Sequence, residues 1–253
     1  MMIESKQNPQ IKAIKKLQQA KGRRKAKRYL LEGPHLLEMA LEAGKQPELI
    51  LCTEASFKAD YANCNCQLIS PQLAGYLAET ESTQAVFAVM PLPEPVALDQ
   101  LTSSAILLLD GLQDPGNLGT IIRTADALGY HSLILGKGSV DPYNSKALRA
   151  MQGSQFKLQI VQADLDQAIP QLQSQGYRIA ASTLSSDSQS VKDYCLTDAK
   201  KWGIILGNEG NGVSPDCIEL ADVSLHIPMT GQAESLNVAI AAAIMMYEYR
   251  PVI

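Results

Sequence analysis

The chain has 253 residues, of which 46% are hydrophobic and 19% are charged. The length suggests about two units at a typical 150 residues per domain, and the composition is that of a globular protein rather than a collagen-like or disordered one. No stretch approaches the roughly 18 uninterrupted apolar residues of a membrane-spanning helix, and the polar, basic N-terminus does not resemble a secretory signal. Five cysteines at irregular spacing argue against a disulfide framework and predict reduced thiols in a cytoplasmic protein.

The net charge of −4 conceals an uneven distribution of charge. Residues 1–28 contain ten Lys and Arg against Glu4 alone, a net charge of +9, which leaves −13 on the remaining 225 residues. A basic arm on an acidic protein is typical of proteins that bind a polyanion, although a solvated basic helix explains the charge equally well. Aromatic residues make up only 5%, which argues against recognition by stacking many bases.

The elements predicted before residue 90 form a small α/β unit. Apolar periodicity predicts helices over 11–17 and 35–41, and short apolar runs predict strands over 49–51, 67–69 and 85–89.

Three prolines at alternate positions mark a break over residues 90–96. Such spacing favours an extended linker over helix or sheet. We therefore expect two domains, residues 1–92 with the basic arm and residues 97–253.

After the linker, apolar strands alternate with helices, which predicts a mostly parallel sheet. A helical stretch is expected over 146–155 and a long apolar helix over 236–249. The strands are predicted over 105–109, 131–135, 158–161, 178–181, 202–206 and 223–227.

The first loop that could carry chemistry follows the strand over 105–109, within a segment that reads LDGLQDPGNLGTIIRTADALG. Asn117 is placed to cap the following helix, and Gly129 to end it. Arg123 projects from the side opposite the apolar stripe of that helix. A solvated arginine on a surface helix is the ordinary alternative.

A second loop reads GNEGNG after the strand over 202–206, and Ser214 followed by Pro215 predicts a helix start there. Its glycines would let a ligand approach the backbone closely. The order of the glycines and their late position exclude a dinucleotide fingerprint, and no Lys-Ser/Thr follows as in a Walker loop. The alternative is a common glycine turn that leaves Glu209 exposed and idle.

A third loop, IPMTGQAESLN, leads into the apolar helix, which is too short to span a bilayer and must be buried in the fold or in a dimer interface. Burial does not explain polar Ser235 and Asn237 at the entrance of that helix. All three loops leave the C-terminal ends of apolar strands, where open α/β sheets bind ligands.

The three segments resemble, in order, the three motifs of the SpoU (TrmH-like) branch of the SPOUT RNA methyltransferases: N-x-G-x-x-x-R, G-N-E-x-x-G and I-P-M-x-G-x-x-E-S-L-N-V. This resemblance covers residues 105–249 and implies a trefoil-knotted, parallel-sheet α/β methyltransferase domain that works as a homodimer. Residues 1–90, with the motif LEGPH, resemble the small ribosomal-protein-like α/β domain that binds the RNA substrate in such enzymes.

The implied reaction is methyl transfer from S-adenosylmethionine to a ribose 2′-hydroxyl of RNA, with no metal. Because an arginine stays protonated in proteins, we expect the arginine of the first motif to act as a cation beside the hydroxyl or through a phosphate, rather than as a base. The resemblance places five polar residues around the reacting ribose: Asn117, Arg123, Glu209, Ser235 and Asn237. It assigns five others to the cofactor cleft: Thr183, Gly207, Ile227, Met229 and Leu236.

The RNA is expected to be 23S ribosomal RNA, by analogy of the N-terminal domain with those of rRNA-modifying relatives. Two alternatives stay open: transfer RNA as the substrate, and a non-catalytic RNA-binding or ribosome-assembly protein on the same scaffold.

Lys146 and Arg149 could contact RNA phosphates, although solvation explains them too. The three histidines and the Cys64-x-Cys66 pair are too isolated for a metal site.

Overall fold

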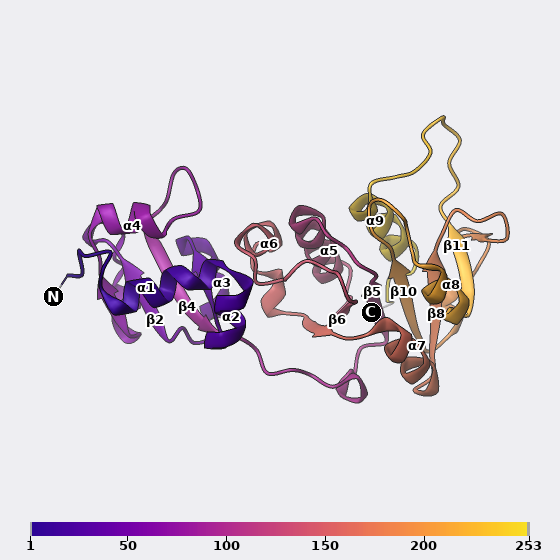
Figure 1. The fold of residues 1–253 in the computed structure, drawn as a ribbon. Coiled ribbons are helices and arrows are strands. Elements are labelled where there is room, and N and C mark those ends of the chain that lie inside the picture. Colours follow the sequence, from indigo (N-terminus) through magenta and orange to yellow (C-terminus); the bar gives the residue numbers. More distant parts are fainter. Residues whose placement is uncertain (1, 252–253) are drawn as a thin grey trace. The chain divides into compact units, whose positions relative to one another are not determined.

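The computed structural model describes residues 2–251, which form two compact units (Figure 1). Unit 1 comprises the chain up to Glu94 together with Asp141–Phe156, and unit 2 comprises Pro95–Val140 together with the chain from Lys157. The proline-rich break therefore separates the two units. Residues 141–156, expected in the second domain, instead pack with unit 1.

Unit 1 contains a mixed sheet of, in order, β1 (Arg28–Glu32), β4 (Val86–Pro91), β2 (Leu49–Cys52) and β3 (Cys66–Leu68). β4 runs antiparallel to β1 and β2, and β3 runs parallel to β2. The helices of this unit are α1 (Pro9–Lys15), α2 (Ala20–Ala26), α3 (Pro34–Glu42), α4 (Pro71–Leu77) and α6 (Ser145–Met151).

The periodicity analysis missed β1, α2 and α4. The last of these carries a recognisable start signal, since Ser70 accepts a hydrogen bond from the backbone of Leu73 and Pro71 occupies the first turn. The helix expected over 146–155 ends at Met151, and a 3-10 turn follows at Ser154–Phe156.

The basic N-terminal segment is a folded part of unit 1 rather than a free arm. Ile11, Ile14 and Leu17 are buried in its core. Those apolar positions recur with helical spacing, so the same segment that carries the charge also supplies apolar contacts to the sheet.

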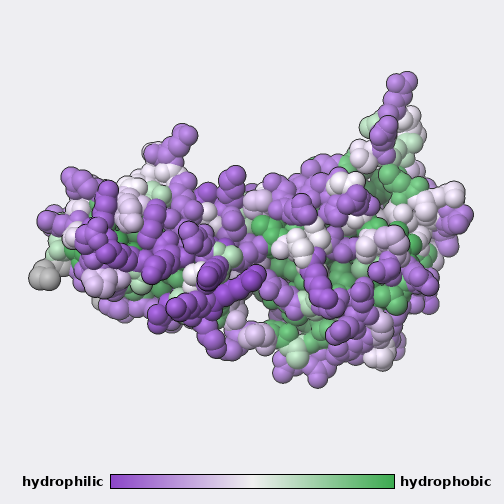
Figure 2. Space-filling view, viewed as in Figure 1, coloured by the Kyte–Doolittle hydropathy of each residue, from purple (hydrophilic) through white to green (hydrophobic). Residues whose placement is uncertain are grey.

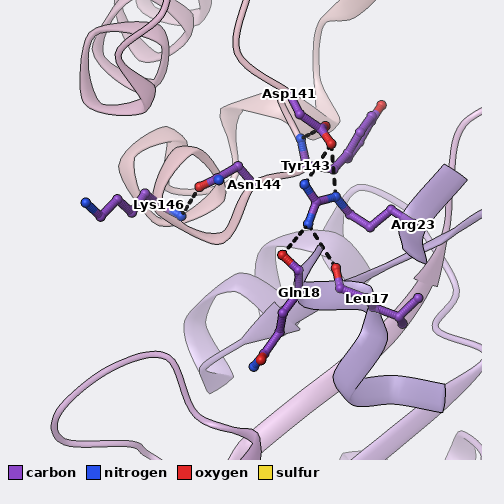
Figure 3. Close-up of polar contacts among 7 residues, drawn as sticks. All are labelled: Leu17, Gln18, Arg23, Asp141, Tyr143, Asn144 and Lys146. Carbon is purple, nitrogen blue, oxygen red and sulfur yellow. Dashed lines mark hydrogen bonds and ion pairs between the residues drawn. The ribbon is translucent and has the colours of Figure 1, made fainter. Parts of the chain in front are cut away.

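Arg23 on α2 is buried, with 3% of its surface exposed, although it belongs to this basic segment. Its guanidinium Nε and Nη2 donate to Oδ2 of Asp141 at 3.0 and 2.7 Å, and Nη1 donates to the backbone oxygens of Leu17 and Gln18 (Figure 3). Asp141 also accepts from the backbone N–H of Tyr143, whose ring lies 4.8 Å from that of Tyr29.

Unit 2 is built on a parallel sheet of, in order, β7 (Gln159–Gln162), β6 (Ser132–Leu135), β5 (Ala105–Leu109), β10 (Lys201–Leu206), β8 (Tyr177–Ser182), β11 (Val223–His226) and β9 (Gln189–Ser190). The pairing between neighbouring strands is parallel throughout. The predicted parallel α/β architecture is confirmed, whereas the short β9 was not predicted. The threaded backbone stays a prediction.

Two pairs of helices cover this sheet. α7 (Leu165–Ser174) and α8 (Pro215–Leu220) pack on one face, and α5 (Pro115–Ala127) contacts α9 (Val238–Glu248) on the other (Figure 1). None of the helices among residues 2–251 is long and apolar enough to cross a membrane.

Short 3-10 turns occur elsewhere. They lie at Lys16–Gln18, Glu54–Ser56, Ala59–Asn63, Leu98–Gln100 and Leu196–Asp198.

We expect Arg23→Met to lower the free energy of unfolding by about 3 kcal/mol, because it leaves the Asp141 carboxylate without its counter-charge in a largely buried position. Denaturant unfolding followed by circular dichroism measures this loss. Arg28→Met is the matched control, since Arg28 pairs with Glu48 on the surface and such pairs contribute about 0–1 kcal/mol. Equal losses in the two variants would contradict the assignment of Arg23 to the core.

Candidate active site

Loops at the C-terminal end of the parallel sheet line a cavity of about 720 Å³. Its walls come from the end of β8 and the loop after it (Ser182–Ser185), from the end of β10 and the loop after it (206–213), from Ile227 and Met229 after β11, and from residues 235–238 before and at the start of α9. The connection between β11 and α9 extends away from the sheet (Figure 1). This volume suits a small organic ligand.

The loop after β10 is closed on itself. The backbones of Asn208 and Gly212 exchange two hydrogen bonds of 3.0 and 3.1 Å, and Oδ1 of Asn208 accepts from the N–H groups of Gly210 and Asn211. A Cβ at Gly207 would lie 1.8 Å from the carbonyl carbon of Gly212. Gly207 is therefore required because two stretches of backbone touch there, in addition to any contact with a ligand.

Glu209 lies at the tip of this loop and joins it to the start of α5. Its Oε1 accepts from Nδ2 of Asn117 at 2.8 Å and from the backbone N–H of Asp114 at 3.3 Å. Oδ1 of Asn117 in turn accepts from Nδ2 of Asn237 at 3.1 Å. Three polar residues, from the loop after β10, the first turn of α5 and the cap of α9, thus form one hydrogen-bonded chain.

The pKa of Glu209 lies below its ordinary value. Partial burial opposes ionisation, but hydrogen bonds from Asn117 and from the backbone N–H groups of Glu209 itself, Asp114 and Gln113 outweigh it. Glu209 is therefore an anion at neutral pH and acts as an acceptor for the Asn117 amide.

The capping residue of α5 differs from the prediction, and this difference affects the hydrogen bonds among Glu209, Asn117 and Asn237. Asp114, not Asn117, caps α5, because Oδ1 of Asp114 accepts the backbone N–H of Asn117 at 2.7 Å. The side chain of Asn117 is thereby free to reach Glu209 and Asn237. At the start of α9, Asn237 is the capping residue, and its Oδ1 accepts the backbone N–H groups of Ala239 and Ile240.

The structure brings most of the predicted site residues together. All five residues assigned to the cofactor cleft line the cavity, namely Thr183, Gly207, Ile227, Met229 and Leu236. Of the polar set, Glu209, Ser235 and Asn237 also line it, and Asn117 is bonded to two of these. Arg123 is exposed on α5 and does not line the cavity, and its side chain makes no hydrogen bond or ion pair within residues 2–251.

Sequence reasoning missed several residues at the site. Ser182 and Ser185 line the cavity beside Thr183, and their position just after a buried parallel strand was the available signal. Asn208 was not singled out, although an Asn in a glycine-rich turn often bonds through its side chain to the backbone two residues on, as Asn208 does to Gly210.

The two basic residues considered for phosphate contacts lie elsewhere. Arg149 pairs with Glu32 at 4.0 Å, whereas Lys146 is exposed.

Comparison with known proteins identifies both parts of the chain. Residues 104–247 match the model of the SpoU rRNA Methylase family, and residues 8–88 match that of the MRM3-like substrate binding domain. The chain belongs to the SpoU rRNA methylase family. The family predicted from the three motifs is thereby confirmed.

Individual relatives and solved structures match nearly the whole chain. The 23S rRNA (guanosine(2553)-2′-O)-methyltransferase RlmP of Bacillus subtilis is 38% identical over 250 residues, covering 98% of each chain. The crystal structure of an AdoMet-bound rRNA methyltransferase from Sinorhizobium meliloti has a TM-score of 0.89 and 28% identity, covering 98% of this chain and 97% of that one. The SpoU methyltransferase AviRb from Streptomyces viridochromogenes, in complex with AdoMet, has a TM-score of 0.83 and 27% identity, covering 96% and 97%.

S-adenosylmethionine is the cofactor of this family, and the cavity fits it. The lining combines apolar side chains such as Ile227 and Leu236 with the backbone of the glycine-rich loop and with the hydroxyl of Thr183. Such a wall can take an adenine ring on its apolar part and the polar groups of the cofactor on its backbone and hydroxyl part.

The lowered pKa of Glu209 predicts a pH signature. Its hydrogen bonds stabilise the fold fully above the unfolded-state pKa of about 4.3, and this stabilisation is lost as the pH falls through the lower folded-state value. We expect the difference in the free energy of unfolding between wild type and Glu209→Gln to be constant at neutral pH and to shrink in acid. Urea titrations at a series of pH values measure it, and a difference that does not change with pH would contradict the assignment.

Proposed function

We propose that this SpoU-family protein transfers the methyl group of S-adenosylmethionine to a ribose 2′-hydroxyl of 23S rRNA, at the guanosine equivalent to position 2553. The observation that carries the proposal is the hydrogen-bonded chain of Glu209, Asn117 and Asn237 at the edge of a cofactor-sized cavity. The choice of nucleotide rests on the RlmP relative, which matches this chain over 98% of both lengths.

The residues of this chain hold and orient the reactants. When bound, S-adenosylmethionine supplies an electrophilic methyl group on its sulfonium. The fixed Asn117 amide and the Ser235 hydroxyl present donors and acceptors to a ribose at the cavity edge, and Glu209 keeps the amide in place. Proper placement of two reactants can itself account for a large part of a rate enhancement. The guanidinium of Arg123 stays protonated and serves as a cation for the hydroxyl or a flanking phosphate.

The proposal includes a homodimer. Ile240, Ile244 and Tyr247 lie on one face of α9 and are 50%, 38% and 60% exposed. An apolar row of this kind favours contact with another protein surface. Arg123 lies outside the cavity of its own chain, so a second copy would complete the polar set that the family resemblance places around the ribose. We place this assembly in the cytoplasm, as the reduced cysteines predict.

Unit 1 supplies RNA contacts in this proposal. Seven basic residues of α1, α2 and their flanks are exposed and make no ion pair within the described part of the chain, and the surface over α1 and α2 is mostly hydrophilic (Figure 2). They are Lys6, Lys12, Lys16, Lys21, Arg24, Lys25 and Lys27. Basic residues on one face attract phosphates in a salt-dependent manner.

Mapping of 2′-O-methyl groups in rRNA tests the function. We expect cells without this gene to lose one mark in 23S rRNA, at the predicted guanosine, and we expect the wild-type gene to restore it. An Arg123→Ala gene should not restore the mark, although calorimetry should show nearly unchanged binding of S-adenosylmethionine. An intact set of 23S rRNA marks in the deletion strain, or a mark lost from transfer RNA instead, would contradict the proposed substrate.

Charge removal on α2 tests the RNA contacts. Deletion of residues 1–28 is unsuitable because it removes the buried Ile11, Ile14 and Leu17. We expect the triple substitution of Lys21, Arg24 and Lys25 by Gln to weaken RNA binding and to reduce the slope of log affinity against log salt by about 2–3, close to one per lost phosphate contact. A control triple at exposed, unpaired lysines elsewhere should leave the slope unchanged: Lys45, Lys192 and Lys200. Equal slopes in the two triples would exclude α2 from the RNA-binding surface.

A further inference from the structure

Asp110 is the first residue after β5 and bonds to both ends of the loop that follows β10. Its backbone N–H donates to the oxygen of Leu206 at 2.8 Å, and its Oδ2 accepts the backbone N–H of Ser214 at 2.7 Å. We propose that Asp110 is a positioning residue for the cofactor: by holding Ser214 it fixes the far end of the loop whose backbone lines the cavity. This inference rests on the proposed function, since it assigns a role in binding S-adenosylmethionine.

The loop needs an anchor at that end. Residues 208–212 form one compact body, closed by the Asn208–Gly212 hydrogen bonds and packed against Gly207. The chain leaves this body through Val213, which is buried and lines the cavity, and reaches Ser214, which does not line it. The hydrogen bond to Asp110 therefore sets where the Val213 wall of the cavity lies.

Among the described residues, the backbone N–H of Ser214 bonds only to Asp110, whereas its carbonyl oxygen accepts the N–H of Ile218 in α8 at 3.0 Å. Ser214 occupies the capping position of α8, yet its side chain makes no capping hydrogen bond to that helix. Asp110 itself forms no ion pair within residues 2–251. The neighbouring Cys217 thiol is neutral at pH 7, because burial raises its pKa to about 11. A hydrogen bond from Ser214 opposes this shift, whereas the charges of Asp110 and Asp166 and a hydrogen bond to Asp110 add to it.

The role of Asp110 is separable from that of Glu209. The connection after β5 holds the loop after β10 at two points, at Ser214 through Asp110 and at Glu209 through Asn117 and two backbone N–H groups. The contact at Glu209 belongs to the hydrogen-bonded chain with Asn117 and Asn237, whereas the contact at Ser214 adjoins the part of the cavity lined by Val213. Loss of the contact at Ser214 should weaken cofactor binding and leave the methyl-transfer step largely intact.

The test removes the same hydrogen bond from either side. Asp110→Ala deletes the acceptor. Ser214→Pro deletes the donor, and the backbone angles of Ser214, φ −62° and ψ 149°, already suit a proline. The matched controls are Asp110→Asn, which keeps an oxygen acceptor, and Ser214→Ala, which keeps the N–H. Each full-length variant is examined for its thermal midpoint, for its affinity for S-adenosylmethionine by calorimetry, and for kcat at saturating cofactor on RNA.

We expect Asp110→Ala and Ser214→Pro each to raise the Kd for S-adenosylmethionine about tenfold, with kcat within about threefold of wild type, and both controls to bind almost as wild type does. The double variant should bind no more weakly than the weaker single one, because both changes remove one interaction. If Asp110→Ala does not fold, Ser214→Pro against Ser214→Ala decides the matter.

Three outcomes would overturn the inference. Suppose that the wild-type protein binds S-adenosylmethionine and methylates RNA, but that Ser214→Pro and Ser214→Ala bind the cofactor equally well. That result would refute the role of Asp110 and leave the proposed function standing. A loss of kcat without a change in Kd would assign Asp110 to the reacting groups instead. A wild-type protein that binds no S-adenosylmethionine would refute the proposed function itself, and this inference with it.

Discussion

In the parallel pairing of β5 with β10, Leu109 lies opposite Leu206, so the connections after these two strands leave the sheet side by side. The rest of the site depends on this register. Because the two connections start together, the Glu209 carboxylate can reach the Asn117 amide and the backbone N–H groups before it. A shift of the pairing by one residue would turn every side chain of β10 to the opposite face of the sheet and would break this contact.

Much of the site could be predicted because all but one of its predicted residues lie in three contiguous segments that resemble the SpoU motifs, the exception being Thr183 after β8. The five cofactor-cleft residues all line the cavity, since loops after parallel strands gather at one edge of a sheet whatever the details of packing. The cap of α5 does not follow from the local sequence. Asp114 and Asn117 are both good capping residues three positions apart, and only the structure shows that Asp114 caps α5 while Asn117 bonds to Glu209.

The features that could not be predicted depend on contacts between distant parts of the chain. Charge counting places Arg23 with the RNA-binding residues, but its partner Asp141 is 118 positions away and no local pattern joins them. The apolar helix near the C-terminus looks uniformly suited to burial. Only one side of it meets α5 and β10, so Ile240, Ile244 and Tyr247 remain on the surface of the single chain.

Unit 1 is assembled from two stretches of chain, and this bears on how such proteins can exchange parts. A recombination event at residues 91–96 would bring in a foreign N-terminal unit but would keep the native 141–156 segment, including Leu148 in the core around Leu37 and Ile50. The incoming sheet would then lack the helix that evolved with it, and the incoming counterpart of Arg23 would face a carboxylate it had not been matched to. A workable transplant of the substrate-binding unit has to carry both stretches together.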